Sequence, residues 1–159
     1  MVSPGTRWQH VFFLAGAGLR TAPPHVDAPA SSSPRRVLLV DDCADLRTLM
    51  RILLEYEGHV VHEARDGPTA IDAVMDGPFD IAFIDVGLPG MTGYEVARGI
   101  RATAPGRHIS LVALTGYGTE EDRRKAFEAG FDEHLIKPTD HDKVAALIRR
   151  LPRRLVEAA

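Results

Sequence analysis

Residues 80–90 of this chain read D-I-A-F-I-D-V-G-L-P-G, and the strongest indication of the fold class lies in this segment. An apolar run from Ile81 to Ile84 lies between two carboxylates, and Pro89-Gly90 follows closely. A short apolar run that ends in a turn signal is typical of a buried strand. The stretch therefore predicts a strand with Asp85 at its carboxyl end, on the edge of a sheet where open α/β folds bind ligands.

The same unit, a short apolar run followed by a helical repeat, recurs along the chain. We predict strands over 37–40, 59–63, 81–85, 109–114 and 133–136, each followed by a helix. The helix ends are marked by Gly58, Gly77, Pro105-Gly106 and Gly130, and Thr92-Gly93-Tyr94-Glu95 fits a capping box. Alternating strands and helices predict an α/β fold in three α-β-α layers around a parallel sheet.

Composition limits the function classes. The chain has 159 residues, 45% of them apolar, and a formal net charge of −3, which does not favour a general nucleic-acid binder. No apolar run reaches the roughly 20 residues of a membrane helix, so we expect a cytoplasmic protein without membrane attachment. The one cysteine, Cys43, excludes an internal disulfide and is expected to be inert and partly buried. His62, His108 and His141 show no metal-ligand spacing and are expected on the surface.

The composition changes near residue 34. Residues 1–34 contain five prolines and Ser31-Ser32-Ser33, a composition that cannot bury enough apolar surface to fold. We predict a disordered leader or linker over 1–34, a folded domain over 35–155 and a short tail over 156–159. Residues 11–19 form an apolar patch faintly similar to a signal peptide, although an upstream translation start explains the leader as well.

Polar side chains lie at the carboxyl ends of four predicted strands: Asp41, Asp42, Asp85, Thr115 and Lys137. Parallel strands end at one edge, so we expect these side chains to lie together. Three crowded carboxylates repel one another, and a hard cation such as Mg²⁺ relieves that repulsion. A carboxylate beside a metal and a lysine ammonium can act as a nucleophile toward phosphorus. The sequence therefore predicts a Mg²⁺ site that takes a phosphate-bearing ligand.

Each of these residues has a simpler interpretation. Asp41 and Asp42 could cap the helix that follows them, Thr115 could be a turn residue, and Lys137 could be a solvated surface residue. Asp85 by itself is most often a turn or cap residue. The joint pattern favours the functional interpretation, because all of these residues stand at strand ends.

The region from about Arg36 to Leu151 resembles the receiver domain of two-component response regulators. The resemblance rests on four motifs in order at strand ends, which are Val40-Asp41-Asp42, residues 84–93, Leu114-Thr115-Gly116 and Leu135-Ile136-Lys137-Pro138. It covers about three quarters of the chain. It implies a flavodoxin-like (βα)5 fold with strand order 2-1-3-4-5, and a Lys-Pro bond that is often cis.

The resemblance also implies roles for individual residues. Asp85 matches the phospho-acceptor, and Asp42 and Asp41 match the metal ligands together with the backbone carbonyl of Gly87. Thr115 and Lys137 match the hydroxyl and the lysine that contact the phosphoryl group. His134 occupies the position where receivers usually carry the Tyr or Phe that moves with the threonine, so the mode of switching is an open question.

These roles lead us to expect a single-domain response regulator rather than an enzyme. It would accept a phosphoryl group on Asp85 from a sensor histidine kinase or a histidine phosphotransfer protein, with Mg²⁺ as cofactor. Only nine residues follow Arg150, too few for a helix-turn-helix module, so we expect output through protein contacts, without direct DNA binding, from a monomer or weak homodimer.

Two other functions stay open at this point. The chain could be a phosphorelay intermediate or the detached receiver of a hybrid histidine kinase, because residues 1–34 are similar to an interdomain linker. A small phosphatase with Asp85 as nucleophile is the remote alternative. Such enzymes usually carry a second acid two residues after the nucleophile, and here that residue is Gly87.

Overall fold

Five parallel strands form one sheet in the order β2-β1-β3-β4-β5. The computed structural model describes residues 33–153, so the predicted leader and tail lie almost entirely outside the described residues. The strands are β1 (Arg36–Val40), β2 (Val60–Ala64), β3 (Ile81–Asp85), β4 (Ser110–Thr115) and β5 (Glu133–Ile136). The predicted parallel sheet and its strand order are confirmed.

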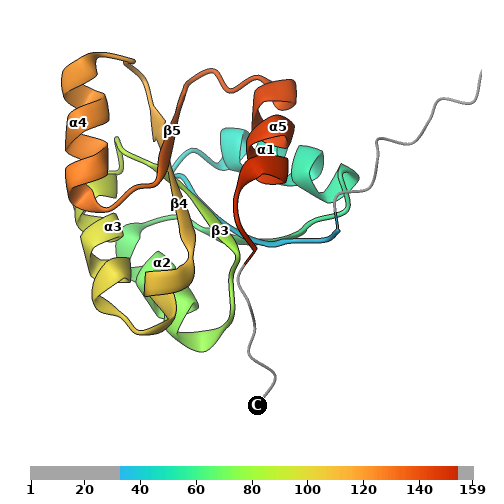
Figure 1. Cartoon of the computed structure of the whole chain (residues 1–159), viewed down its shortest axis with the longest axis horizontal. Coiled ribbons are helices and arrows are strands. Elements are labelled where there is room, and N and C mark those ends of the chain that lie inside the picture. The colour runs from blue at the N-terminus through green and yellow to red at the C-terminus, as the bar shows by residue number, and fades with distance from the viewer. Residues whose placement is uncertain (1–32, 154–159) are drawn as a thin grey trace, which may run out of the picture.

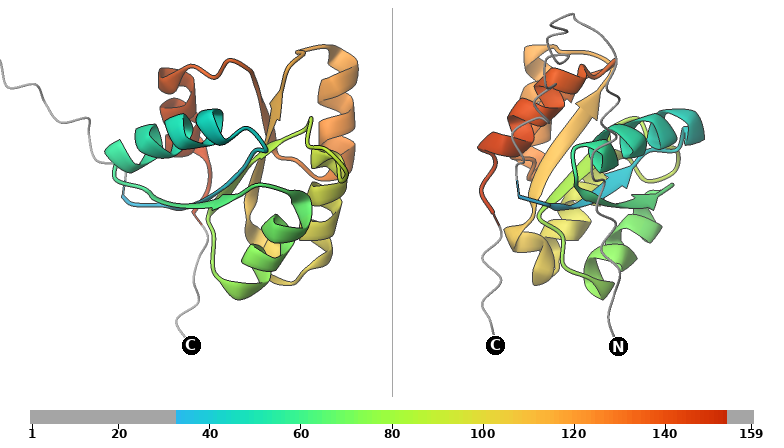
Figure 2. Two further views of the ribbon diagram at one scale, coloured as in Figure 1. Left: turned by 180° about the vertical axis from the view of Figure 1, so that it is seen from behind. Right: turned by 90° about the vertical axis from the view of Figure 1, so that its right-hand side faces the viewer.

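Each strand is followed by a helix, as right-handed parallel crossovers require. The helices are α1 (Ala44–Tyr56), α2 (Gly67–Asp76), α3 (Gly93–Ala102), α4 (Glu120–Ala129) and α5 (His141–Arg150). Figures 1 and 2 show α1 and α5 on one face of the sheet and α2, α3 and α4 on the other. The three-layer flavodoxin-like architecture is therefore confirmed.

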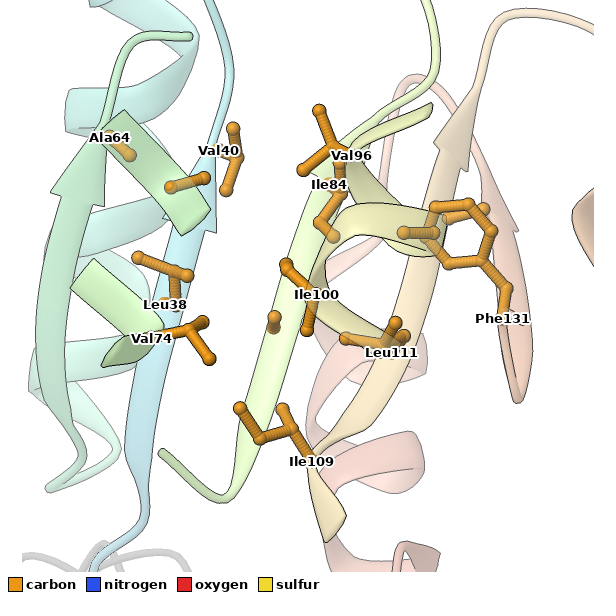
Figure 3. Close-up of a cluster of buried hydrophobic side chains, with 14 of the residues drawn as sticks. Leu38, Val40, Ala64, Val74, Ile84, Val96, Ile100, Ile109, Leu111 and Phe131 are labelled. Atoms are coloured by element: carbon orange, nitrogen blue, oxygen red, sulfur yellow. The ribbon is translucent and has the colours of Figure 1, made fainter. Parts of the chain in front are cut away.

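Alternate residues of the central strands supply the two cores. Leu38, Ala82 and Ile84 face α2, α3 and α4, and Figure 3 shows this cluster with Val96 and Ile100 of α3. The residues between them on the strands, such as Leu39 and Phe83, face α1 and α5. Because β1, β3 and β4 are buried on both faces, their sequences read as continuous apolar runs.

Most predicted helix ends are correct. Thr92 and Glu95 form the reciprocal capping box that starts α3. Thr119 caps the start of α4, and the C-cap residue Gly130 takes the left-handed conformation with φ 105°. Gly58, just after α1, also has a positive φ, of 90°.

The predicted end of α3 is wrong. The helix ends at Ala102, and Pro105–His108 forms a separate 3₁₀ turn. Thr103 takes an extended backbone, its hydroxyl donates to the Ile100 carbonyl at 2.7 Å, and it accepts the Gly106 N–H at 3.0 Å. A side-chain hydroxyl that competes for backbone groups stops the helix before the proline does.

The second strand is shifted by one residue from its prediction, which leaves His59 outside it. His59 is 5% exposed, and its Nδ1 accepts the backbone N–H of Arg35 at 3.2 Å. The Arg35 guanidinium donates to the carbonyls of Ile148, Leu151 and Pro152 at 2.8–3.3 Å. His59 therefore supports the contact between the start of β1 and the end of α5.

No helix in residues 33–153 is long and apolar enough to cross a membrane. Two exposure predictions need correction. Cys43 is exposed, because it takes the N-cap position of α1 at the open edge of the sheet. His141 is half-buried, with Nε2 3.1 Å from Glu57 Oε1.

The His59 environment predicts a pH dependence of stability. Burial is the main cause that lowers the pKa of His59. The positive charges of Arg35 and Arg153 lower it further, and the negative charges of Glu57 and Asp80 act in the opposite direction. The folded state therefore binds the proton less readily than the unfolded chain. The contribution of neutral His59 to the free energy of unfolding is complete above the pKa of the unfolded chain, about 6.5. It is lost as the pH falls through the lower pKa of the folded state.

Urea unfolding of the wild type and of His59→Gln at pH 7.5, 6.5 and 5.5 measures this effect. We expect the wild type to lose stability between pH 6.5 and 5.5 and the variant to lose less, because a glutamine oxygen can accept the Arg35 N–H without titrating. His108→Gln, at an exposed position, should keep the wild-type pH profile. Identical profiles for the wild type and His59→Gln would contradict the assignment.

Candidate functional site

The parallel sheet brings the predicted site residues to one edge. Asp41 follows β1, Asp85 is the last residue of β3, Thr115 is the last residue of β4, and Lys137 follows β5. The register pairs Asp85 with Leu114 and Thr115 with Ile136, so these strands end within one residue of each other. Asp41, Asp85 and Thr115 are buried, with 3%, 8% and 5% exposure.

Lys137 connects the two buried carboxylates. Its Nζ lies 2.8 Å from Asp41 Oδ2 and 3.2 Å from Asp85 Oδ1. Burial lowers the pKa of Lys137, but the hydrogen bond to Asp41 and the charge of Asp85 outweigh burial and hold the pKa above its ordinary value. The ammonium therefore stays charged at neutral pH and offsets the repulsion between the carboxylates. The Lys137-Pro138 bond is cis, as the resemblance implies.

The start of α1 holds Asp41 in place. Its Oδ1 accepts the backbone N–H of Cys43 at 2.8 Å, and its carbonyl accepts the Arg47 guanidinium at 2.6 Å. Arg47 also donates to Glu63 on β2 at 3.1 Å. We did not predict this role for Arg47. Its position one turn into the helix was the available signal, because helical side chains point back toward the N-terminus.

The turn after β3 holds Asp85. Its Oδ1 accepts the Gly87 N–H at 3.0 Å, which leaves Oδ2 without a protein donor among the described residues. A Cβ at Gly87 would stand 3.6 Å and 3.9 Å from the two carboxylate oxygens, at ordinary contact distance. Residue 87 therefore borders the acceptor carboxylate directly, and glycine leaves that side open.

Gly93 sets the distance between α3 and the end of β3. Its N–H donates to the Val86 carbonyl at 3.1 Å. A Cβ there would collide with the Asp85 carbonyl oxygen and would lie 2.7 Å from Val86 Cα. Backbone atoms cannot move as a flexible side chain can, so only glycine fits at this close approach.

No hydrogen bond joins the side chains of Thr115 and His134 among the described residues. The Thr115 hydroxyl donates to the Tyr117 carbonyl at 2.8 Å, so it is held within the loop after β4. His134 is half-buried on β5, opposite Ala113 in the register. Gly118 in the same loop lies against the exposed side chain of Ile136, which a Cβ at residue 118 would overlap.

The acidic residues fit a divalent cation. Asp41, Asp42 and Asp85 each offer a carboxylate oxygen, and these atoms lie within 4.8 Å of one another. Two oxygens bound directly to one Mg²⁺ lie at most about 4.2 Å apart, twice the metal–oxygen distance. The set therefore fits Mg²⁺ after a small rotation of a side chain, or with one carboxylate bound through water. Asp42 is exposed and keeps the site open to solvent.

The strand order and the residues at the edge of the sheet together define the class of domain. It is a flavodoxin-like α/β domain with an acidic cluster and a lysine at the carboxyl ends of its strands. The response regulator receiver domain family matches residues 37–149. The chain belongs to this family, the receiver domains of two-component systems.

Individual relatives agree with this assignment. The transcriptional regulatory protein ResD of Bacillus subtilis is 35% identical over 119 residues, which cover 75% of this chain and 48% of ResD. This chain thus spans about half the length of that relative. The chemotaxis protein CheY4 of Vibrio cholerae superposes with a TM-score of 0.72 at 26% identity, covering 76% of this chain and 100% of CheY4.

A third relative bears on the metal. The receiver domain of the sensor histidine kinase PA1611 from Pseudomonas aeruginosa has a TM-score of 0.70 at 28% identity, and covers 75% of this chain and 98% of that domain. It was solved with a magnesium ion coordinated in its active-site cleft. A related receiver thus binds the cation that the acidic cluster here fits.

The acidic cluster predicts that Mg²⁺ stabilises the fold. A ligand at ten times its Kd adds about 1.4 kcal/mol to the free energy of unfolding, or roughly 3–6 °C in Tm for a domain of this size. We expect this rise in thermal melts at millimolar Mg²⁺ and a much smaller rise for Asp42→Asn. Asp45→Asn, an exposed change in the first turn of α1, should respond to Mg²⁺ as the wild type does. An unchanged wild-type Tm would count against the metal site.

Gly93 predicts a second effect on stability. Gly93→Ala should lower the free energy of unfolding by about 1–3 kcal/mol, because the methyl group overlaps backbone atoms at the end of β3. Gly77→Ala is the matched control, since a Cβ there meets no atom within 4 Å. Chemical denaturation of both variants checks this. Equal losses for the two would refute the close-approach argument.

Proposed function

We propose that this chain accepts a phosphoryl group on Asp85 from a phosphohistidine. The donor is a sensor histidine kinase or a histidine phosphotransfer protein, and the product is an aspartyl phosphate. The observation that carries the proposal is the setting of Asp85. It is a buried carboxylate at the open edge of the sheet, with an ammonium 3.2 Å away and two further carboxylates suited to a cation.

The two oxygens of Asp85 have different surroundings. Oδ1 is held by the Gly87 N–H and the Lys137 ammonium, and Oδ2 is the oxygen available to attack phosphorus. In the transfer an O–P bond forms, the N–P bond of the phosphohistidine breaks, and the imidazole nitrogen leaves with the bonding electron pair. Lys137, already charged, stands ready to neutralise the phosphoryl oxygens. Mg²⁺ held by Asp41, Asp42 and Asp85, with the Gly87 carbonyl, would add positive charge at the same place.

The hydroxyl of Thr115 is the proposed switch. In the present structure it donates to the Tyr117 carbonyl, and a phosphoryl group on Asp85 would offer it a stronger, charged acceptor. Release of Tyr117 would let the loop after β4 shift, and the contact between Gly118 and Ile136 would carry that shift to β5. His134 lies on the same strand and would respond by rotation of its ring.

The chain would act as a cytoplasmic single-domain signalling protein rather than a turnover enzyme. Output would pass through protein contacts without direct DNA binding, from a monomer or weak homodimer. The proposal is supported by the similarity to the chemotaxis protein CheY4, whose solved chain is covered over its full length.

A relay role is the second candidate. It is favoured by the similarity to the receiver domain of a sensor histidine kinase. A relay receiver passes its phosphoryl group on to the histidine of a phosphotransfer protein. Incubation of the phosphorylated chain with purified phosphotransfer proteins distinguishes the two functions. Rapid loss of the phosphoryl group to one of them favours the relay, and retention favours the switch.

Acetyl phosphate tests the acceptor without a known kinase. We expect intact-mass spectrometry to show the addition of one phosphoryl group in the presence of Mg²⁺, and peptide mapping to place it on Asp85. Asp85→Asn should abolish the addition, because an amide is not a nucleophile toward phosphorus. Asp76→Asn, at an exposed position on α2, is the control. Phosphorylation that persists in Asp85→Asn would reject the acceptor assignment.

A further inference from the structure

A groove between α1 and α5 lies next to the candidate site. Its volume is about 340 Å³, and the lining includes Leu46, Leu49 and Leu53 of α1 and Val144 and Ile148 of α5. Asp41 and Lys137 stand at one end of the same groove. The lining is mostly aliphatic, which suits an apolar occupant rather than a charged ligand.

Helix α1 has a second apolar side that the core does not use. Met50 and Leu54 are buried beneath the helix. Leu46, Leu49 and Leu53 follow each other at spacings of three and four, so they form a separate stripe along the groove. Leu46 and Leu49 are 49% and 56% exposed. Exposed aliphatic stripes of this kind mark binding surfaces.

The chain enters the described domain beside this groove. Arg35 donates to the carbonyls of Ile148 and Leu151 at 3.3 Å and 2.8 Å, and Arg153 donates to the Ser33 carbonyl. Ile148 is itself part of the groove wall. The residues that precede Ser33 are therefore attached next to the last turn of α5.

Residues 11–19, V-F-F-L-A-G-A-G-L, have the composition that the groove selects. They carry no charge and include two phenylalanines. Residues 20–32 separate them from Ser33, a distance of up to about 43 Å when extended. The α5 wall from His141 to Ile148 is only about 10 Å long. The connection is therefore long enough to reach any part of the groove.

We propose that the groove between α1 and α5 binds residues 11–19 of the same chain. Attachment at Ser33 gives the segment an effective concentration on the order of millimolar, an advantage that separate apolar partners lack. The bound segment would cover the α1 surface beside Asp41.

Trp8 is a natural probe of this contact, because it is the one tryptophan of the chain and stands three positions before the segment. In the wild-type chain the bound segment should shield Trp8 from acrylamide. In Leu49→Glu, which puts a charge into the groove, the efficiency of quenching should rise about twofold or more. Phe12→Glu should raise the quenching in the same way. Met75→Glu is the matched control, because Met75 is 59% exposed on α2, away from the groove.

The result is independent of phosphorylation, so it is separate from the test of Asp85. Shielding of Trp8 that is lost in Leu49→Glu and Phe12→Glu, kept in Met75→Glu and unchanged on dilution supports the proposal. Quenching in the wild type equal to that of N-acetyltryptophanamide overturns it. Shielding that survives Leu49→Glu overturns it as well, and shielding that disappears on dilution assigns the contact to a second copy instead.

Discussion

The ion pairs of Lys137 with Asp41 and Asp85 are the interaction on which the edge of the sheet depends. The pair with Asp41 joins residues that stand 96 positions apart in the chain, at the ends of β1 and β5. Two carboxylates with 3% and 8% exposure would repel each other and would be costly to bury without a cation. The ammonium offsets that cost, so the packing of β5 and the chemistry of the site depend on the same contact.

Different parts of helix α1 contribute to the candidate site, to the core and to the groove. Its N-cap residue supplies the Cys43 N–H and its first turn supplies the Arg47 guanidinium, and both hold Asp41. One side of its middle, with Met50 and Leu54, fills the core above β1. The other side forms a wall of the groove. A change on this helix can therefore affect the acceptor site, stability or the groove, depending on which side carries it.

The accuracy of the sequence predictions followed the range of the interactions. The capping box of Thr92 and Glu95 and the end of α4 before Gly130 were predicted correctly, because each depends on residues within one helical turn. The predicted end of α3 was wrong although its cause is local, because two local signals competed there and the Thr103 hydroxyl stopped the helix before the proline. Cys43 was placed too deep and His59 was assigned to a strand, because both depend on how distant segments pack.

The amino-acid sequence is enough to specify the parallel α/β fold and the set of polar residues at its strand ends. Apolar runs specify strands, and parallel strands must end at one edge. Which of these residues touch depends on the folded chain. Lys137 pairs with Asp41 and Asp85, whereas the Thr115 hydroxyl stays with Tyr117. The reason is that spacing along a chain defines which edge a residue joins, while distances of 3 Å depend on strand register, loop conformation and side-chain rotamers.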